Sequence, residues 1–265
     1  MITELKDYIV EIGKTFPHCK TSKHLFFRGH SDKNYKLKPS IFRKVSYNEK
    51  DILLDFKQYA PAHKINYDYI NDRDKLLADM RHFGLPTRLL DWTLAPLNAL
   101  FFACRENSKK DAEVIVLNPW GYWSEVVREK RVAEIHQIYI LSRALLSGEW
   151  KFDDIKEFIK KKYGYEQLIP EDIEYPFPFI ASYTNDRILH QRGCFTIHGC
   201  NETDIESMKN IEKYIIKIKI SGEHKGNILK ELNYLYVNEY SIFPDFDGMK
   251  KMIKNTGGLF NVDYF

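Results

Sequence analysis

The sequence predicts an α+β protein with a central mixed or antiparallel sheet and helical insertions. Short apolar runs typical of strands occur at residues 24–30, 111–117, 193–199 and 213–220. Stretches with helical spacing lie between them, at about 48–110 and 122–165. Because hydrophobic residues make up 44% of the 265 residues, the chain has enough apolar surface for a core, and we expect a single domain over 1–265.

The N-terminal part predicts a helix followed by a strand. Apolar residues recur at helical spacing through residues 2–13, and Gly13 marks the expected end of that helix. Residues 24–30, HLFFRGH, predict a buried strand that ends at Arg28, where Gly29 turns the chain into a loop. The Gly and Pro of residues 84–87 are expected to break one helix before another begins.

The remaining elements follow from apolar alternation and from turn residues. We expect strands at 111–117, 193–199 and 213–220, extended chain at 175–179 and helices within 122–163. Residues 222–237 predict a helix running into a short strand, and residues 243–254 predict a turn with a closing helix. In residues 213–220, Ile or Tyr alternates with Lys, so one face of that strand should contact solvent.

Composition excludes several classes of protein. The formal net charge of +3 is too small to indicate polyanion binding by composition alone. No apolar run approaches the roughly 20 residues of a membrane span, and the N-terminus lacks a signal-peptide pattern, so we expect a cytoplasmic protein without membrane contact. The four cysteines include no CxxC pair and are expected to be free thiols, with Cys104 in the core.

The first candidate site is the Arg28-Gly29 pair. A guanidinium offers bidentate donors to phosphate or carboxylate, and a neighbouring glycine lets a ligand approach the backbone. An ion pair between Arg28 and a structural carboxylate explains the same residues equally well.

The second candidate surrounds the GLPT turn. Arg88 and Asp91 are three residues apart, a spacing that on a helix predicts a local ion pair, with Thr93 as a cap. His82 is either a structural imidazole or a proton-transfer group. Trp92 completes the group.

The third candidate is a polar helical turn that leads into a strand. Arg187 and Gln191 are four residues apart and would project donors from one side of a helix toward a common ligand. A solvated helix face is the alternative. His198, within the following strand, is expected to be a core histidine.

The fourth candidate holds three carboxylates around a proline turn. Asp245 and Asp247 suggest a metal pair, although a turn residue at Asp245 and a helix cap at Asp247 explain them more economically, and we expect no metal. Glu239 has no evident capping role and is the carboxylate with the strongest claim to chemistry.

Four segments together resemble the FRG domain family, which is named for a Phe/Tyr-Arg-Gly motif matched by Phe27, Arg28 and Gly29. The segments are FFRGH, HFGLPTRLLDWTLAPLNALFFA, NDRILHQRGCFTIHG and SIFPDFDG. The family usually has Gln where this chain has Arg81. The resemblance identifies a domain without implying a reaction.

The order of these motifs also resembles that of ADP-ribosyltransferase folds. That resemblance implies that Arg28 binds the phosphates or ribose of NAD, and that Glu239 is the late acid acting on the nicotinamide ribose. The middle Ser-Thr-Ser element of the arginine-specific group is absent. By extension, Trp92 or Phe27 would stack on a flat ring and His82 would activate the acceptor.

The functional hypothesis from these resemblances is transfer of ADP-ribose from NAD to a macromolecular acceptor, as in a toxin or a phage-defence effector with a neutralising or regulatory partner. Its binding residues are expected to be Arg28, Gly29, Arg88, Asp91, Trp92, Arg187 and Gln191. One alternative is a non-catalytic nucleotide or nucleic-acid binding module that uses the arginines. Another is a metal-dependent phosphodiester hydrolase that uses Asp245 and Asp247.

Overall fold

A computed structural model describes residues 1–15, 25–44, 47–63, 73–122, 152–164, 166, 176–180, 185–199, 202 and 204–256. It contains a six-stranded sheet with the order β4-β5-β2-β1-β3-β6, in which every neighbouring pair of strands is antiparallel. The strands are β1 (Phe26–His30), β2 (Leu89–Thr93), β3 (Ala112–Leu117), β4 (Phe177–Phe179), β5 (Gly193–Ile197) and β6 (Ile215–Ile220). The predicted α+β class is confirmed, and its sheet is antiparallel.

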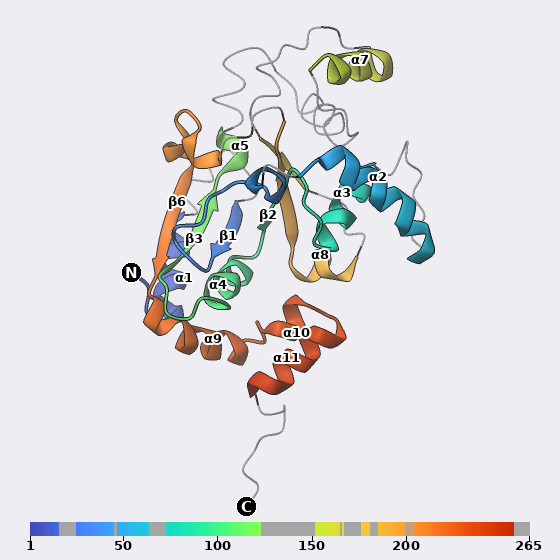
Figure 1. The fold of residues 1–265 in the computed structure, drawn as a ribbon. Coiled ribbons are helices and arrows are strands. Elements are labelled where there is room, and N and C mark those ends of the chain that lie inside the picture. The colour runs from blue at the N-terminus through green and yellow to red at the C-terminus, as the bar shows by residue number, and fades with distance from the viewer. Residues whose placement is uncertain are drawn as a thin grey trace, which may run out of the picture.

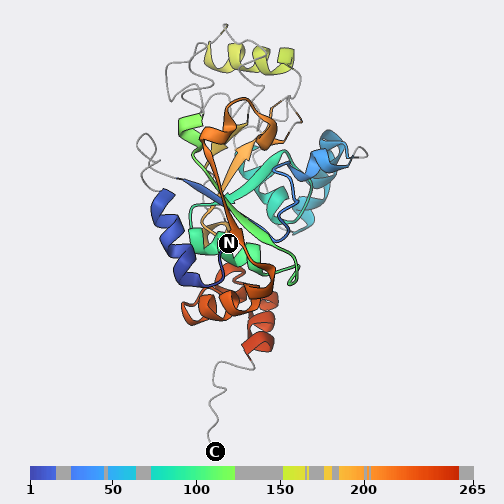
Figure 2. The same ribbon diagram turned by 90° about the vertical axis from the view of Figure 1, so that its left-hand side faces the viewer.

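Helices cover both sides of this sheet. The described α-helices are α1 (Leu5–Thr15), α2 (Glu49–Tyr59), α3 (Arg73–His82), α4 (Pro96–Cys104), α5 (Pro119–Tyr122), α7 (Phe152–Tyr163), α8 (Asp186–His190), α9 (Lys225–Tyr234), α10 (Glu239–Ile242) and α11 (Phe246–Thr256). Figure 1 shows α10 and α11 together below the sheet, and Figure 2 shows α1 on the opposite side of the sheet from α2 and α3. None of the helices in the described ranges is long and apolar enough to cross a membrane.

Alternation along the strands divides the core between the two faces. Phe27 packs with α1, α4 and α9, whereas its neighbour Phe26 packs with Trp92 and Leu37 on the other face. The same alternation separates Val114 from Ile115 in β3. In β6, the lysines are exposed and the later isoleucines are buried, as the alternation predicts.

Gly29 lies where α4 crosses β1. A Cβ atom at this position would overlap the backbone of Ala99 and Ala103, so the close packing of helix against strand requires glycine here. The expectation that the strand ends at Arg28 and turns into a loop at Gly29 is wrong, because β1 continues through Arg28 and Gly29 to His30.

The central strands β1 and β2 separate soon after they meet. They pair at one position, Phe27 with Thr93, whereas β1 pairs with β3 along all five of its residues. Beyond that position, the backbone of β1 from Arg28 and that of β2 before Thr93 are no longer joined by a ladder. The resulting gap in the middle of the sheet exposes polar backbone and side-chain groups to a common space.

The prediction of helix through residues 48–110 is partly wrong, because residues 89–93 form strand β2. This segment has few β-branched residues, so its local propensity does not indicate a strand. All five of its residues pair with β5 instead. The strand places Arg88 and Asp91 in different environments, so the local ion pair expected from helical spacing does not form.

Three smaller expectations also change. Helix α1 passes Gly13 and ends at Thr15, whose hydroxyl donates to the carbonyl oxygen of Ile12. No strand follows α9, since Tyr236 adopts a left-handed turn conformation with φ of 59°. Cys104 and Cys194 are buried free thiols. Cys19, Cys200 and most of the helices expected within 122–163 lie outside the described residues.

Candidate functional site

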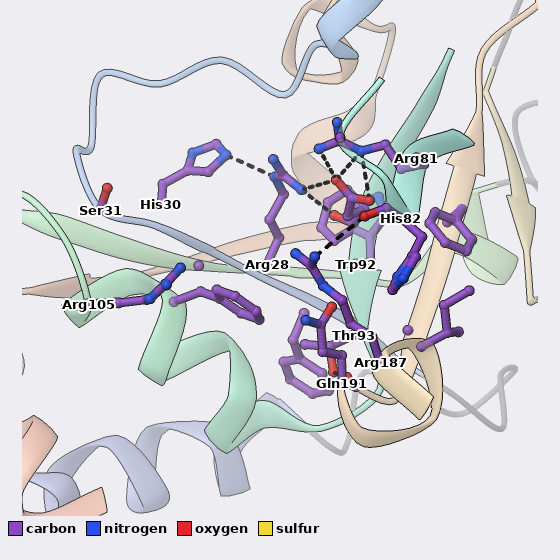
Figure 3. Close-up of a pocket in the computed structure, with 18 of the residues that line it drawn as sticks. Arg28, His30, Ser31, Arg81, His82, Trp92, Thr93, Arg105, Arg187 and Gln191 are labelled. Carbon is purple, nitrogen blue, oxygen red and sulfur yellow. Dashed lines mark hydrogen bonds and ion pairs between the residues drawn. The ribbon is translucent and has the colours of Figure 1, made fainter. Parts of the chain in front are cut away.

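A cavity of about 530 Å³ opens where β1 and β2 separate. Residues from β1, α3, β2, α8 and the end of α4 line it, and Figure 3 shows their side chains around a common space. Of the residues proposed from sequence, those on its wall are Arg28, Gly29, His82, Asp91, Trp92, Arg187 and Gln191. Segments far apart in the sequence therefore meet at one site.

The cavity wall is rich in arginine. In the described part of the chain, five arginines line it, namely Arg28, Arg43, Arg81, Arg105 and Arg187, against the two carboxylates of Asp91 and Glu106. Guanidinium groups stay protonated at neutral pH, so the wall carries an excess of positive charge. A concave wall of one charge sign attracts anions from solution.

Asp91 is the carboxylate at the centre of this wall. Arg81 donates to both of its oxygens, from Nε at 3.0 and 2.8 Å and from one terminal nitrogen at 2.5 Å. Burial opposes ionisation of Asp91, but the charge and hydrogen bonds of Arg81, together with the charge of Arg28, outweigh it and hold its pKa below the ordinary value. Asp91 is therefore ionised and orients two guanidinium groups.

Arg28 is fixed from three sides. Its terminal nitrogen donates to the backbone carbonyl of Asp91 that the separation of the strands leaves exposed, and the Asp91 carboxylate lies 3.8 Å away. Its Nε donates to Nε2 of His30 at 3.2 Å. Burial lowers the Arg28 pKa to about 10, opposed by Asp91, so the side chain remains a cation at neutral pH.

His30 accepts that hydrogen bond as a neutral imidazole. Burial is the main reason that its pKa lies below the ordinary value, and Nδ1 lies 3.6 Å from the Glu113 carboxylate. A proton on Nδ1 faces Glu113 and leaves Nε2 free to accept from Arg28. Glu113 and His30 thus set the orientation of Arg28 from behind the cavity.

Arg88 does not belong to the cavity. It is 5% exposed and donates through Nε to Glu49 at 2.8 Å, while one terminal nitrogen donates to the carbonyl oxygens of His198 and Gly199 at 3.0 Å. The expected binding role for Arg88 is corrected, because its guanidinium is enclosed by acceptors of the protein itself.

Arg187 and Gln191 both reach the cavity from α8. Asn185 caps this helix by accepting from the backbone amide of Ile188 at 2.9 Å. The Arg187 guanidinium lies 4.8 Å from the centre of the Phe243 ring and donates to the carbonyl oxygen of His82 at 3.4 Å. Gln191 donates to the carbonyl oxygen of Ile242 at 3.4 Å. The four-residue spacing therefore placed both residues correctly on one side of a helix.

Glu239 lies behind the cavity instead of on its wall. It is the first residue of α10, is 8% exposed, and accepts a hydrogen bond at 2.7 Å from Arg105, which does line the cavity. Its second oxygen, Oε2, is buried without a hydrogen-bond partner in the described ranges. One ion pair thus separates the proposed late acid from the cavity.

The aromatic and imidazole groups differ in how much they present to a ligand. Trp92 is 4% exposed and donates through its indole nitrogen to Thr196, so most of its ring belongs to the core. His82 is half-buried, and burial together with Arg187 lowers its pKa, so it is neutral at pH 7. The aromatic rings more open to the cavity are Tyr35 and Phe83, which are 48% and 54% exposed.

The two aspartates near the C-terminus have local structural roles. Asp245 accepts from the backbone amide of Gly248 at 2.7 Å and caps α11, and Asp247 lies within its first turn. This reverses the expected assignment of cap and turn, because Phe246 already begins the helix. Among the residues that the structure describes, no three His, Cys, Asp or Glu side chains are grouped as they would be around a metal ion.

Several contributors to the site were not proposed from the sequence. They include the arginines Arg43, Arg81 and Arg105 and the aromatic residues Tyr35, Phe83 and Phe243. Arg105 directly follows the apolar helix 96–104, where a charged side chain reaches the edge of the core. This position could have indicated Arg105 as a site residue from the sequence. The role of Phe243 depends on contacts with Arg105 and Arg187 that sequence distance conceals.

Comparison with known proteins gives one family. A family model described as the FRG domain matches residues 23–112. No curated protein and no solved structure matches the chain. The matched range contains Arg28, Arg81 and Asp91, whereas Arg187, Glu239 and Phe243 lie beyond it.

Proposed function

We propose that the cavity between strands β1 and β2 binds a phosphorylated nucleotide. The observation that carries this proposal is the five-arginine wall with one central carboxylate, Asp91, that orients Arg28 and Arg81. Arginine forks match the geometry of phosphate oxygens. Phosphate would therefore be held by groups that the protein already positions.

Cavity size and lining favour a nucleotide over an inorganic anion or a nucleic acid. A volume of about 530 Å³ is that of a small-molecule site. Tyr35, Phe83 and Phe102 offer aromatic surface at the same cavity, and such rings stack on bases. The combination of phosphate donors and ring surface fits the two ends of a nucleotide.

Titration calorimetry with AMP, ADP, NAD and adenosine tests this proposal. We expect each phosphorylated compound to bind at least about tenfold more tightly than adenosine, since charge-assisted hydrogen bonds are worth about 1.5–3 kcal/mol. The affinity should fall as salt rises. Lys230→Gln on exposed α9 removes a positive charge outside the cavity and serves as the matched control for Arg28→Gln. Equal binding of adenosine and AMP would contradict the proposal.

A second candidate, ADP-ribosyl transfer from NAD, is favoured by one feature of Glu239. Its Oε2 is buried without a partner in the described chain and lies one ion pair from the cavity. An unpaired buried carboxylate oxygen is costly, and a ribose hydroxyl would satisfy it if Arg105 moved aside. Glu239 would then stabilise the positive charge that develops as the nicotinamide bond breaks.

Mass spectrometry of nicotinamide and modified acceptors in a cell lysate tests this second candidate. We expect nicotinamide release by the wild type and its loss in Glu239→Gln, a variant that keeps an acceptor for Arg105. NAD binding without nicotinamide release, or equal release by the variant, would leave nucleotide binding as the function.

A further inference from the structure

The arginines of the cavity form two groups with different supports. Arg28, Arg43 and Arg81 surround Asp91, and we call them the Asp91 group. Arg105 and Arg187 both lie over the ring of Phe243, at 4.5 and 4.8 Å from its centre, and we call them the Phe243 group. Figure 3 shows Arg105 apart from Arg28 and Arg81.

The residues of the Phe243 group lie outside strands β1 and β2. Arg105 follows α4, Arg187 belongs to α8, and Phe243 follows α10. Helix α8 is held on α10 by two contacts, one from Gln191 to the carbonyl oxygen of Ile242 and one from His190 Nδ1 to that of Ser241, 3.1 Å away. The second group is therefore a built feature of the fold.

The two arginines of the Phe243 group differ in how their charge is neutralised. Arg105 forms ion pairs with Glu239 at 2.7 Å and with Glu106 at 3.7 Å. Arg187 forms no ion pair with a carboxylate in the described ranges, and its hydrogen bond goes to a neutral carbonyl oxygen at 3.4 Å. Burial and the charge of Arg105 lower the pKa of Arg187, while Asp91 and Asp245 oppose this effect. The two guanidinium groups repel each other, so an anion that enters the cavity and contacts both of them would stabilise both.

Both groups line the same cavity, whose volume suits one nucleotide-sized ligand. We propose that the Asp91 group and the Phe243 group are two phosphate subsites for one ligand, and that the cavity selects nucleotides with more than one phosphate. This inference rests on the proposed nucleotide binding and names the ligand class within it. A nucleoside monophosphate would use the Asp91 group alone.

The experiment compares AMP with ADP, and phosphate with pyrophosphate, by calorimetry on the full chain. In the wild type, ADP should bind at least about tenfold more tightly than AMP, because a second charge-assisted contact is made. Arg187→Gln should bring ADP close to AMP while leaving AMP within about threefold. Arg28→Gln should weaken both ligands, and Lys230→Gln neither.

A second variant guards against effects on folding. Arg105→Gln alone would leave Glu239 buried without its partner, so Arg105→Gln is combined with Glu239→Gln. The double variant should repeat the selective loss of ADP affinity. Melting temperatures measured without ligand verify that each variant is folded.

The outcomes separate this inference from the function on which it rests. If ADP binds no more tightly than AMP, or if Arg187→Gln weakens both ligands equally, the two-subsite inference is overturned even though nucleotide binding stands. If no nucleotide binds but pyrophosphate still binds more tightly than phosphate, with the advantage lost in Arg187→Gln, nucleotide recognition fails and the paired subsites remain. If no phosphorylated ligand binds, both are overturned.

Discussion

Arg88 directly precedes strand β2 and Arg28 lies within strand β1, yet the two guanidinium groups have different surroundings. Arg88 is enclosed by Glu49 and two carbonyl oxygens, so its charge and donors are matched within the protein. Arg28 shares Asp91 with Arg81 in a wall where arginines outnumber carboxylates. The matched arginine stabilises the fold, and we propose that the arginines in excess of carboxylates bind an anion in the cavity.

The largest expected effect comes from breaking the matched pair. Arg88→Met leaves the buried Glu49 carboxylate, 4% exposed, without its cation, and should reduce the free energy of unfolding by about 3–5 kcal/mol. Urea denaturation measures this loss. The double variant Arg88→Met with Glu49→Leu should recover much of it. A loss below about 1 kcal/mol in the single variant would show that Arg88 is not structural.

A pH effect follows from His198, which lies behind Arg88. Burial, together with the charge of Arg88, lowers the His198 pKa to about 3. The unfolded chain takes up a proton below about pH 6.5 that the folded protein does not, so stability is complete above that pH and declines below it. Between pH 6.5 and 4.5, the loss from this residue should be about 2.3 kcal/mol.

Chemical denaturation at several pH values measures that decline, and His198→Leu is the comparison. Neither ring nitrogen of His198 has a hydrogen-bond partner in the described ranges, so the leucine removes a titrating group without stranding another. The slope of stability against pH should become shallower in this variant. An unchanged slope would assign the decline to other groups.

In the cavity, the variant Arg28→Lys tests whether the geometry of the guanidinium group contributes to binding as well as its charge. Lysine keeps the positive charge but loses the planar fork that contacts His30 and Asp91. We expect the binding of AMP to weaken by about 1.5–3 kcal/mol, roughly 10–150-fold, with a smaller change in stability. If Arg28→Lys bound AMP with wild-type affinity, the positive charge of Arg28 would matter for binding and its planar geometry would not.

The smallest effect is expected at Arg81, where the family usually has glutamine. Arg81→Gln keeps one donor for Asp91 but removes the bidentate contact. Nucleotide affinity should fall by about 0.5–1.5 kcal/mol, less than for Arg28→Lys, because Arg81 acts mainly through Asp91. Calorimetry on both variants under one buffer ranks them, and the reverse order would place Arg81 in direct contact with the ligand.

Much of the local structure was readable along the chain. The alternation of Ile and Lys in β6 and the apolar run of β3 predicted strands that exist, and the spacing of Arg187 and Gln191 predicted their shared direction. Strand β2 could not be predicted from the sequence. Its five residues follow a helix-breaking turn and precede an apolar helix, and its partner β5 lies about 100 residues later.

The sequence by itself determined the α+β class, the resemblance to the FRG domain over residues 23–112 and the polar motifs, because periodicity, turn residues and short motifs are local properties. Only the tertiary structure decided which arginine is matched and which is not. In the folded chain, Glu49 contacts Arg88, Asp91 contacts both Arg28 and Arg81, and the ring of Phe243 contacts Arg105 and Arg187. The physical reason is that charge and hydrogen-bond balance depend on through-space neighbours, which the chain brings together from distant positions.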